Sequence, residues 1–220
     1  MPDELKLRKA MVQASLELDR RGLNRGTSGN VGVRCDDRIL VTPSGVSARD
    51  LTAQSMVLLA ANGDVIGVGR PSSEWRFHRD ILMSRPDVHA IVHVHSPFAT
   101  TLACLGLEIP PFHYMIAAAG GATIRCAPYA LFGTQELSDH ALAALRDRRA
   151  CLLANHGMIA AGRDLEHALA LCVEVESLCE QYWRARQIAE PLHLSDAQMA
   201  EVMERFKTYG QRADAEQDRR

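Results

Sequence analysis

The spacing of apolar residues along the chain predicts helices that alternate with short strands. Apolar side chains recur every three or four residues over positions 4–21, so this segment is expected to form a helix with one buried face, ended by Gly22. Capping residues indicate further helices that begin at Ser72 or Ser73, at Ser96–Pro97, near Leu137, at Asp164 and at Ser195. The last of these helices is expected to stop at Gly210.

Strands are predicted where apolar residues alternate with other residues or form short runs between turn-forming residues. Hairpins are expected around Asp36–Asp37 and Asn62–Asp64, with further strands over 90–96, 123–126, 151–154 and 158–160. Hairpins mixed with single strands and helices are typical of an antiparallel sheet covered by helices. We therefore predict an α/β fold with three layers, in which helices flank a central mixed, largely antiparallel sheet.

Composition adds the size and class of the protein. The 220 residues are 47% hydrophobic and 24% charged, enough to build a full core, and no linker interrupts them. We predict one domain over residues 1–210 and a charged, flexible tail over 211–220. A net charge of −2 gives no general attraction to nucleic acid or to a membrane surface, so an anionic ligand must be bound locally.

The expected location is the cytoplasm. The first residues, Met1–Lys9, lack the apolar core of a signal peptide. No apolar run approaches the roughly 20 residues of a membrane span.

The strongest chemical signal is the strand that contains His93 and His95. Side chains two residues apart on a strand point to the same side with Cα atoms ~6.6 Å apart, so both imidazoles can reach one metal ion. Ala90, Val92 and Val94 point the other way and are apolar, as expected for a strand whose back face meets a core. A histidine pair of this kind can also be two partly buried side chains, so its meaning depends on neighbouring motifs.

A third imidazole and a carboxylate are candidates to complete the metal site. His156 lies in a tight turn between two short apolar runs, where it could join His93 and His95. Three neutral imidazoles suit Zn²⁺ and leave a position open for substrate. Glu74, in the first turn of its helix, could act as a fourth ligand or as a base.

Three loops have a composition suited to binding phosphate. Gly26–Asn30, Thr42–Gly45 and Ser72–Ser73 are rich in Gly, Ser, Thr and Asn. Such loops offer backbone N–H groups and hydroxyls without bulky side chains, which is what a phosphate dianion requires. None of them matches a Walker or Rossmann fingerprint.

In their order and spacing, these motifs resemble the class II aldolase/adducin family over nearly the whole chain. The motifs are Gly26–Asn30, Thr42–Gly45, Pro71–Glu74, His93–His95 and Asn155–Gly157. Three more segments resemble the L-fuculose-1-phosphate aldolase branch of that family: His113–Gly121, Ala127–Gly133 and Phe206–Gly210.

The resemblance implies a class II aldolase-like fold and a zinc-dependent aldehyde-lyase. It implies Zn²⁺ bound by His93, His95 and His156 with Glu74 nearby. Phosphate would be bound by Gly29, Asn30, Ser44, Gly45, Ser72 and Ser73.

The implied oligomer is a cyclic homotetramer with active sites between subunits. Tyr114 and Tyr209 match tyrosines that reach into that cleft. Tyr209 is expected to close the aldehyde side of the site and shield it from water.

The implied reaction is reversible cleavage of a ketose 1-phosphate of the L-fuculose 1-phosphate type. The products are dihydroxyacetone phosphate and a small aldehyde such as L-lactaldehyde. Zn²⁺ would supply the Lewis acid, Glu74 would move the proton at the enediolate carbon, and Tyr114 would serve the C4 hydroxyl.

Related activities define the alternatives. An L-ribulose-5-phosphate 4-epimerase requires an additional acid, and no Asp or Glu lies between Glu108 and Glu136. A methylthioribulose-1-phosphate dehydratase is left open by the motifs. A non-enzymatic adducin-like protein is disfavoured because the three histidines and Glu74 are all present. The aldehyde stays open among L-lactaldehyde, glycolaldehyde, acetaldehyde and a methylthio-aldehyde.

Overall fold

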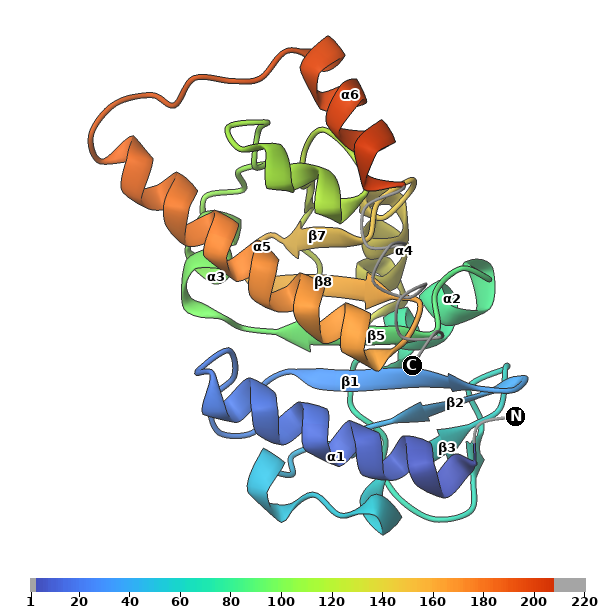
Figure 1. Cartoon of the computed structure of the whole chain (residues 1–220). Coiled ribbons are helices and arrows are strands. Elements are labelled where there is room, and N and C mark those ends of the chain that lie inside the picture. Colours follow the sequence, from blue (N-terminus) through green and yellow to red (C-terminus); the bar gives the residue numbers. More distant parts are fainter. Residues whose placement is uncertain (1–2, 208–220) are drawn as a thin grey trace, which may run out of the picture.

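The computed structural model describes residues 3–207, and its centre is an eight-stranded sheet (Figure 1). The strands are β1 (Asn30–Cys35), β2 (Arg38–Val41), β3 (Val57–Leu59), β4 (Val65–Ile66), β5 (Ala90–Val94), β6 (Cys126–Ala127), β7 (Ala150–Leu153) and β8 (Gly157–Gly162). The α-helices are α1 (Glu4–Arg20), α2 (Trp75–Ser84), α3 (Pro97–Cys104), α4 (Gln135–Ala144), α5 (Leu165–Arg186) and α6 (Asp196–Phe206). Short 3₁₀ segments are η1 (Ala48–Asp50), η2 (Ala53–Ser55) and η3 (Tyr114–Ala119).

The strands are arranged in the order β4-β3-β2-β1-β5-β8-β7-β6. Within the described part of the chain, β6 and β7 run parallel, and every other neighbouring pair is antiparallel. The predicted mixed, largely antiparallel sheet is therefore confirmed.

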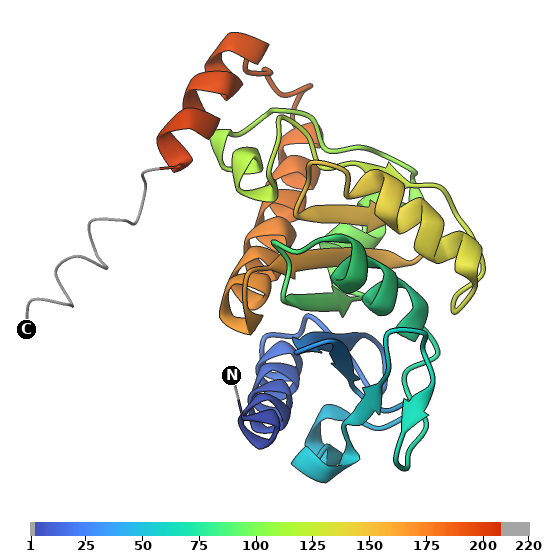
Figure 2. The ribbon, with the colours of Figure 1, turned by 90° about the vertical axis from the view of Figure 1, so that its right-hand side faces the viewer.

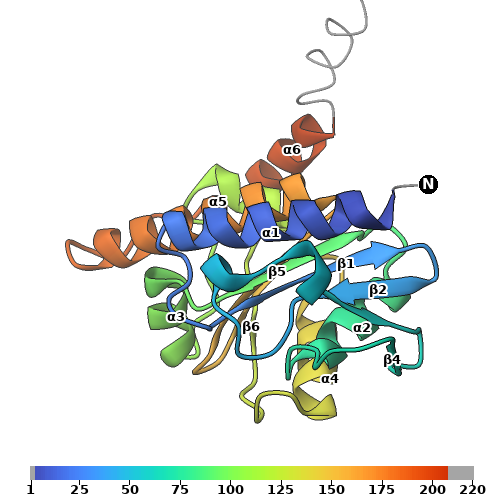
Figure 3. The ribbon, with the colours of Figure 1, turned by 90° about the horizontal axis from the view of Figure 1, so that it is seen from below.

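Helices cover both faces of the sheet and form three layers (Figures 2 and 3). α1 and α5 lie on one side, and α2 and α4 lie on the other. Each side has its own apolar core, and β5 divides its side chains between them: Val92 and Val94 enter the core under α1 and α5, whereas Ile91 enters the core under α2 and α4. His93 follows the same alternation and packs edge-on against Phe77 of α2.

Most element boundaries follow the sequence patterns, including both capping-box bonds between Ser195 and Gln198 at the start of α6. The start of α2 differs from the prediction. Its N-cap is Glu74 rather than Ser72 or Ser73: the Ser72 hydroxyl accepts a hydrogen bond from the Glu74 backbone N–H at 3.3 Å, but Ser73 and Glu74 form a turn and the helix starts at Trp75. The expected helix end at Gly210 and the tail at 211–220 lie outside the described residues.

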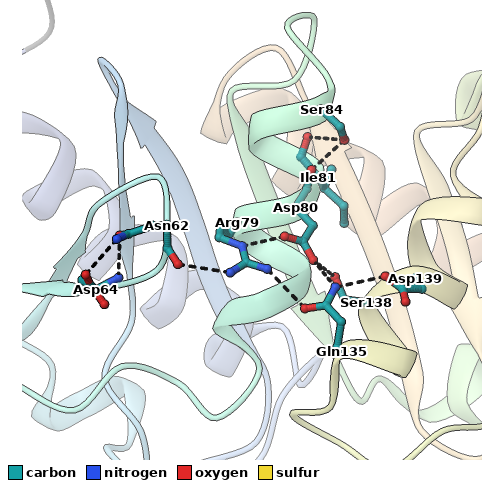
Figure 4. Close-up of polar contacts among 9 residues, drawn as sticks. All are labelled: Asn62, Asp64, Arg79, Asp80, Ile81, Ser84, Gln135, Ser138 and Asp139. Atoms are coloured by element: carbon teal, nitrogen blue, oxygen red, sulfur yellow. Dashed lines mark hydrogen bonds and ion pairs between the residues drawn. The ribbon is translucent and has the colours of Figure 1, made fainter.

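A polar cluster joins α2 to α4 and fixes the helix that begins at Glu74 (Figure 4). The Asp80 carboxylate accepts hydrogen bonds from Arg79 at 2.6 Å, from Gln135 at 2.7 Å and from the Ser138 hydroxyl at 2.6 Å. Burial by itself would raise the pKa of Asp80, but these three donors outweigh it and hold the pKa below its usual value. The carboxylate therefore stays ionised and links the two helices on this face.

Over residues 3–207, no helix is both long and apolar enough to cross a membrane.

Candidate metal centre and substrate pocket

The four predicted metal-ligand residues lie close together at one end of the sheet. Because β1 and β5 are antiparallel, the start of β1 lies beside the end of β5, and Asn30 pairs with His93. On the other side of β5, His93 pairs with Ile159 of β8. The turn between β7 and β8, which carries His156, therefore reaches the same end of the sheet.

Four side chains converge there. The Nε2 atoms of His93 and His95 are 3.0 Å apart, and the three imidazole centroids lie 4.8 to 4.9 Å from one another. The Glu74 carboxylate contacts His93 Nε2 and His156 Nε2, each at 3.2 Å. One potential ligand atom from each of these four residues lies within 4.8 Å of the others, so a single cation can contact all four.

Backbone contacts orient the histidines. The ring of His93 donates from Nδ1 to the carbonyl oxygen of Met158 at 2.9 Å, which leaves the Nε2 lone pair directed into the site. The backbone N–H of His95 donates to the Asn24 side-chain oxygen at 3.2 Å. A Cβ atom at Gly157 would collide with the Val94 carbonyl oxygen, so glycine is needed for the β7–β8 turn to approach β5 closely.

The electrostatics suit a divalent cation. Burial lowers the pKa of His95 and of His156 to about 4 each, so both imidazoles are neutral near pH 7. Burial would raise the pKa of Glu74, but His93, His156 and Asn30 outweigh it and hold the pKa well below its usual value. Glu74 Oε1 is also buried without a hydrogen-bond partner. A carboxylate beside three converging imidazole nitrogens is a donor set typical of Zn²⁺ and similar metals.

A pocket adjoins the four side chains. It is lined by all six residues expected to bind phosphate: Gly29, Asn30, Ser44, Gly45, Ser72 and Ser73. Two of the loops are joined by hydrogen bonds from the Ser44 N–H to the Arg70 carbonyl at 3.0 Å and from the Ser72 N–H to the Thr42 carbonyl at 2.9 Å.

The pocket would bind an anion without a basic side chain. Among the described residues that line it, none is Lys or Arg. Ser72 and Ser73 precede the N-terminus of α2, where backbone N–H groups and the helix dipole favour negative charge. An anion would therefore be bound by neutral N–H and hydroxyl donors.

The side chain of Asn30 is turned toward the histidines and Glu74. Its amide nitrogen donates to Glu74 Oε2 at 2.9 Å, and its amide oxygen contacts His78 Nε2. Both ends of this side chain are therefore engaged within the protein.

Of the two tyrosines expected to have catalytic roles, Tyr114 belongs to the described part of the chain, and it does not line this pocket. Tyr114 begins η3, is about half exposed, and lies near His113 and Phe206 rather than in the lining of the pocket. Tyr209 lies outside the described residues.

Sequence reasoning assigned no role to an aromatic wall of the pocket. Tyr129 and Phe132 line it and are 60% and 61% exposed. The segment is fixed to α2 by a hydrogen bond from Arg76 to the Gly133 carbonyl at 2.8 Å. The signal in the sequence was two aromatic residues in a short loop ended by glycine. Thr27 and Ser28, in the predicted phosphate loop Gly26–Asn30, and Asn155, in the motif that carries His156, also line the pocket, although none was named individually as a site residue.

Comparison with known proteins is consistent with this geometry. The family described as "Class II Aldolase and Adducin N-terminal domain" matches residues 9–183. The chain is 56% identical over 207 residues to a "5-methylthioribulose-1-phosphate/5-deoxyribulose-1-phosphate aldolase" of Rhodospirillum rubrum, covering 94% of each chain. It is 49% identical over 208 residues to the "L-fuculose phosphate aldolase" of Escherichia coli K12, covering 94% of this chain and 97% of the relative. Among solved structures, an "L-fuculose 1-phosphate aldolase" superposes with a TM-score of 0.89 at 38% identity, covering 91% of this chain and 96% of the other.

Proposed function

Because this chain belongs to the class II aldolase and adducin family and is an aldehyde-lyase, we propose that it cleaves a ketose 1-phosphate between C3 and C4. The products would be dihydroxyacetone phosphate and a small aldehyde, in a reversible reaction. The observation that carries the proposal is the convergence of Glu74 with three histidines beside a pocket of phosphate-binding composition.

We propose Zn²⁺ as the metal, held by His93, His95, His156 and Glu74. The donor set fits, since the imidazoles are turned inward and Glu74 Oε1 is buried without a donor. The cation would supply a Lewis acid that stabilises negative charge on the carbonyl and adjacent hydroxyl oxygens of the substrate.

Glu74 is the proposed acid–base group at C3. In the synthetic direction its carboxylate takes a proton from C3 of dihydroxyacetone phosphate, and the C–H electron pair becomes part of the enediolate. C3 then bonds to the aldehyde carbon, and the aldehyde oxygen takes a proton, for which Tyr114 is the proposed donor. Cleavage reverses these steps: the C4 hydroxyl loses its proton, the C3–C4 bond breaks, and Glu74 returns a proton to C3.

Phosphate binding would orient the substrate against this proton-transfer group. The proposed contacts are Gly29, Asn30, Ser44, Gly45, Ser72 and Ser73, which line the pocket next to Glu74. Since the Asn30 side chain is engaged by Glu74 and His78, its contribution to phosphate would come from the backbone.

The proposed physiological substrate is a ketose 1-phosphate with a short apolar terminus. The 56% identical relative is named for 5-methylthioribulose 1-phosphate and 5-deoxyribulose 1-phosphate. Cleavage of these compounds at C3–C4 would release (methylthio)acetaldehyde or acetaldehyde, neither of which carries a hydroxyl group. The aromatic wall formed by Tyr129 and Phe132 supports an aldehyde with an apolar end of this kind.

L-Fuculose 1-phosphate is the second candidate, because relatives named for it are 49% identical. Its aldehyde product, L-lactaldehyde, carries a hydroxyl that would face the same aromatic side chains. We therefore expect a lower kcat/KM for L-fuculose 1-phosphate than for the two ribulose 1-phosphate derivatives.

We propose a homotetramer in which each site is completed by a neighbouring subunit. Tyr114 is about half exposed and absent from the pocket of its own chain, which supports a role in a second copy. Tyr209 is proposed to close the aldehyde side of the neighbouring site.

The test is a substrate panel with zinc-loaded enzyme, in which release of dihydroxyacetone phosphate is measured by a coupled reductase. We expect the highest kcat/KM for 5-methylthioribulose 1-phosphate or 5-deoxyribulose 1-phosphate, then L-fuculose 1-phosphate. Conversion of L-ribulose 5-phosphate to its C4 epimer would favour the epimerase instead. Loss of water from methylthioribulose 1-phosphate without C–C cleavage would favour the dehydratase.

A further inference from the structure

A buried row of three side chains runs from α2 through β1 to the candidate proton-transfer group. His78 is fully buried, and Asn30 and Glu74 are 8% and 6% exposed. His78 Nε2 contacts the Asn30 amide oxygen, and the Asn30 amide nitrogen donates to Glu74 Oε2 at 2.9 Å. The mechanism described above uses Glu74 and leaves His78 without a role.

The donors and acceptors in this row are fixed by the carboxylate. An ionised Glu74 can only accept, so the nitrogen of the Asn30 amide must face it and the oxygen must face His78. A hydrogen bond to that oxygen then requires a proton on His78 Nε2. His78 Nδ1 is left unprotonated, and it is buried without a hydrogen-bond partner.

The geometry forms a clamp between two elements. Glu74 and His78 are four residues apart, one helical turn, and both reach the same amide on β1. Among residues 3–207, Asn30 is the one side chain with a hydrogen bond to this carboxylate, whereas His93 and His156 contact it at 3.2 Å. Asn30 can therefore orient the Glu74 carboxylate through a hydrogen bond that involves neither a cation nor the histidines.

β1 is shaped to admit the His78 ring. Gly32 lies two residues after Asn30, on the same face of the strand. A Cβ atom at Gly32 would overlap the imidazole of His78, so any larger residue would force the ring to move. The space that the His78 ring of α2 occupies is thus left by the missing side chain at Gly32 of β1.

We propose that His78 is a positioning residue that holds the Asn30 amide, and through it the Glu74 carboxylate, in the orientation needed for proton transfer at C3. The proposal rests on the proposed function of Glu74. It concerns the direction of the carboxylate and assigns His78 no contact with substrate or metal.

The principal experiment compares His78→Leu with His78→Gln in the zinc-loaded enzyme. Leucine fills the space without a donor, whereas the amide nitrogen of glutamine can take the place of Nε2. Loss of a hydrogen-bond partner behind a metal site typically lowers activity by about 10- to 100-fold. We expect His78→Leu to lower kcat by this amount, with KM and zinc content near those of the parent, and His78→Gln to recover most of the loss.

Two measurements separate positioning from a merely structural effect. Exchange of the C3 hydrogen of dihydroxyacetone phosphate with deuterated water reports proton transfer without aldehyde, and it should fall with kcat in His78→Leu. Imidazole ¹⁵N spectra of the metal-free protein should show His78 protonated at Nε2. Protonation at Nδ1 instead, equal losses in the two variants, or loss of zinc in parallel with activity would overturn the proposal.

If His78→Leu does not fold, Gly32→Ala replaces it, because the added methyl displaces the ring while every donor is kept. The same pattern, lower kcat and exchange at unchanged KM, is expected, and parental values for both would overturn the proposal. Glu74→Gln separates a failure of the proposed proton-transfer role of Glu74 from a failure of the positioning role of His78. Full turnover in Glu74→Gln would remove the proposed function of Glu74, whereas full turnover in His78→Leu alone would remove only the positioning role.

Discussion

The carboxylate of Glu176 on α5 accepts a hydrogen bond from the Ser96 hydroxyl at 2.6 Å, directly after the metal-ligand candidate His95. The same carboxylate accepts from the backbone N–H groups of Phe98 at 2.8 Å and Ala99 at 2.9 Å. Ser96 is the N-cap of α3 but makes no capping bond with its own side chain. The start of α3 is therefore capped by a residue from another helix, and this cap fixes the chain next to His95.

We expect Glu176→Gln to destabilise the protein and weaken metal binding. An amide offers one acceptor oxygen where three donors now converge, and loss of a charge-assisted hydrogen bond costs about 1.5–3 kcal/mol. Urea unfolding and competition with a zinc chelator measure the two effects. Glu180→Gln on the same helix is the control, since its ion pair with Arg184 is exposed and should be worth under ~1 kcal/mol. Equal effects in the two variants would contradict the cap.

We expect about one Zn²⁺ per chain after mild purification. His95→Ala should lose most of the metal and the activity, because one of four converging donors is removed. Metal analysis by mass spectrometry gives the content, and His193→Ala, at an exposed position between α5 and α6, is the matched control. Full zinc and activity in His95→Ala would exclude the four-residue site.

Glu74→Gln is expected to fold and to bind a phosphate-bearing enediolate mimic, while turnover falls by about 10² to 10⁴. The amide keeps the shape of the side chain and removes the proton acceptor. Calorimetry with the mimic and steady-state assays separate binding from chemistry. A kcat near that of the parent would leave Glu74 as no more than the N-cap of α2.

The metal-free protein is expected to lose stability as the pH falls below about 6.5. Burial lowers the pKa of His78 from 6.5 to about 3, with a smaller effect of His93, so the unfolded chain binds this proton more readily than the folded one. The stabilising contribution is complete above pH 6.5 and is lost as the pH falls toward 3. Between pH 6.5 and 5 the free energy of unfolding should fall by about 2 kcal/mol.

Urea midpoints of the metal-free protein measured across this range test the acid sensitivity. His78→Gln removes the titrating group, so its stability should decline less steeply than that of the parent. Parallel curves for the two proteins would show that His78 does not carry the effect.

Tyr114 is expected to act in a neighbouring subunit. Tyr114→Phe and Glu74→Gln should each be nearly inactive alone. Subunits of the two variants, mixed by unfolding and refolding together, should form some sites with both native residues and regain a fraction of the activity. Mixing without any recovery would indicate that Tyr114 and Glu74 serve the same chain's site.

Much of the fold and of the candidate metal site could be predicted because their signals are local. The two-residue spacing of His93 and His95 determines their shared direction on a strand, and apolar periodicity determines which faces are buried. The predicted N-cap of α2, Ser72 or Ser73, was wrong. The Ser72 hydroxyl accepts a hydrogen bond from the Glu74 N–H, and Glu74 itself is the N-cap. A local capping rule includes such a bond but does not predict the turn at Ser73–Glu74 that delays the helix until Trp75.

Other features depend on contacts between distant segments. The aromatic wall at Tyr129 and Phe132 is aligned with the pocket through Arg76 and Gly133, which are 57 positions apart. The row from His78 to Glu74 requires the packing of α2 on β1, with Gly32 making the space. Neither arrangement has a short sequence signature.

The metal-ligand candidates come from α2, β5 and the β7–β8 turn, so their convergence depends on how the strands pair. β5 is a central strand, paired with β1 on one side and β8 on the other. A slip of one residue in either pairing would turn His93 to the α1–α5 side of the sheet, away from Glu74 and His156. The four side chains can thus converge on one cation only when both of these long-range pairings are correctly aligned. A cation held by these residues would therefore stabilise the correctly paired sheet over a misaligned one.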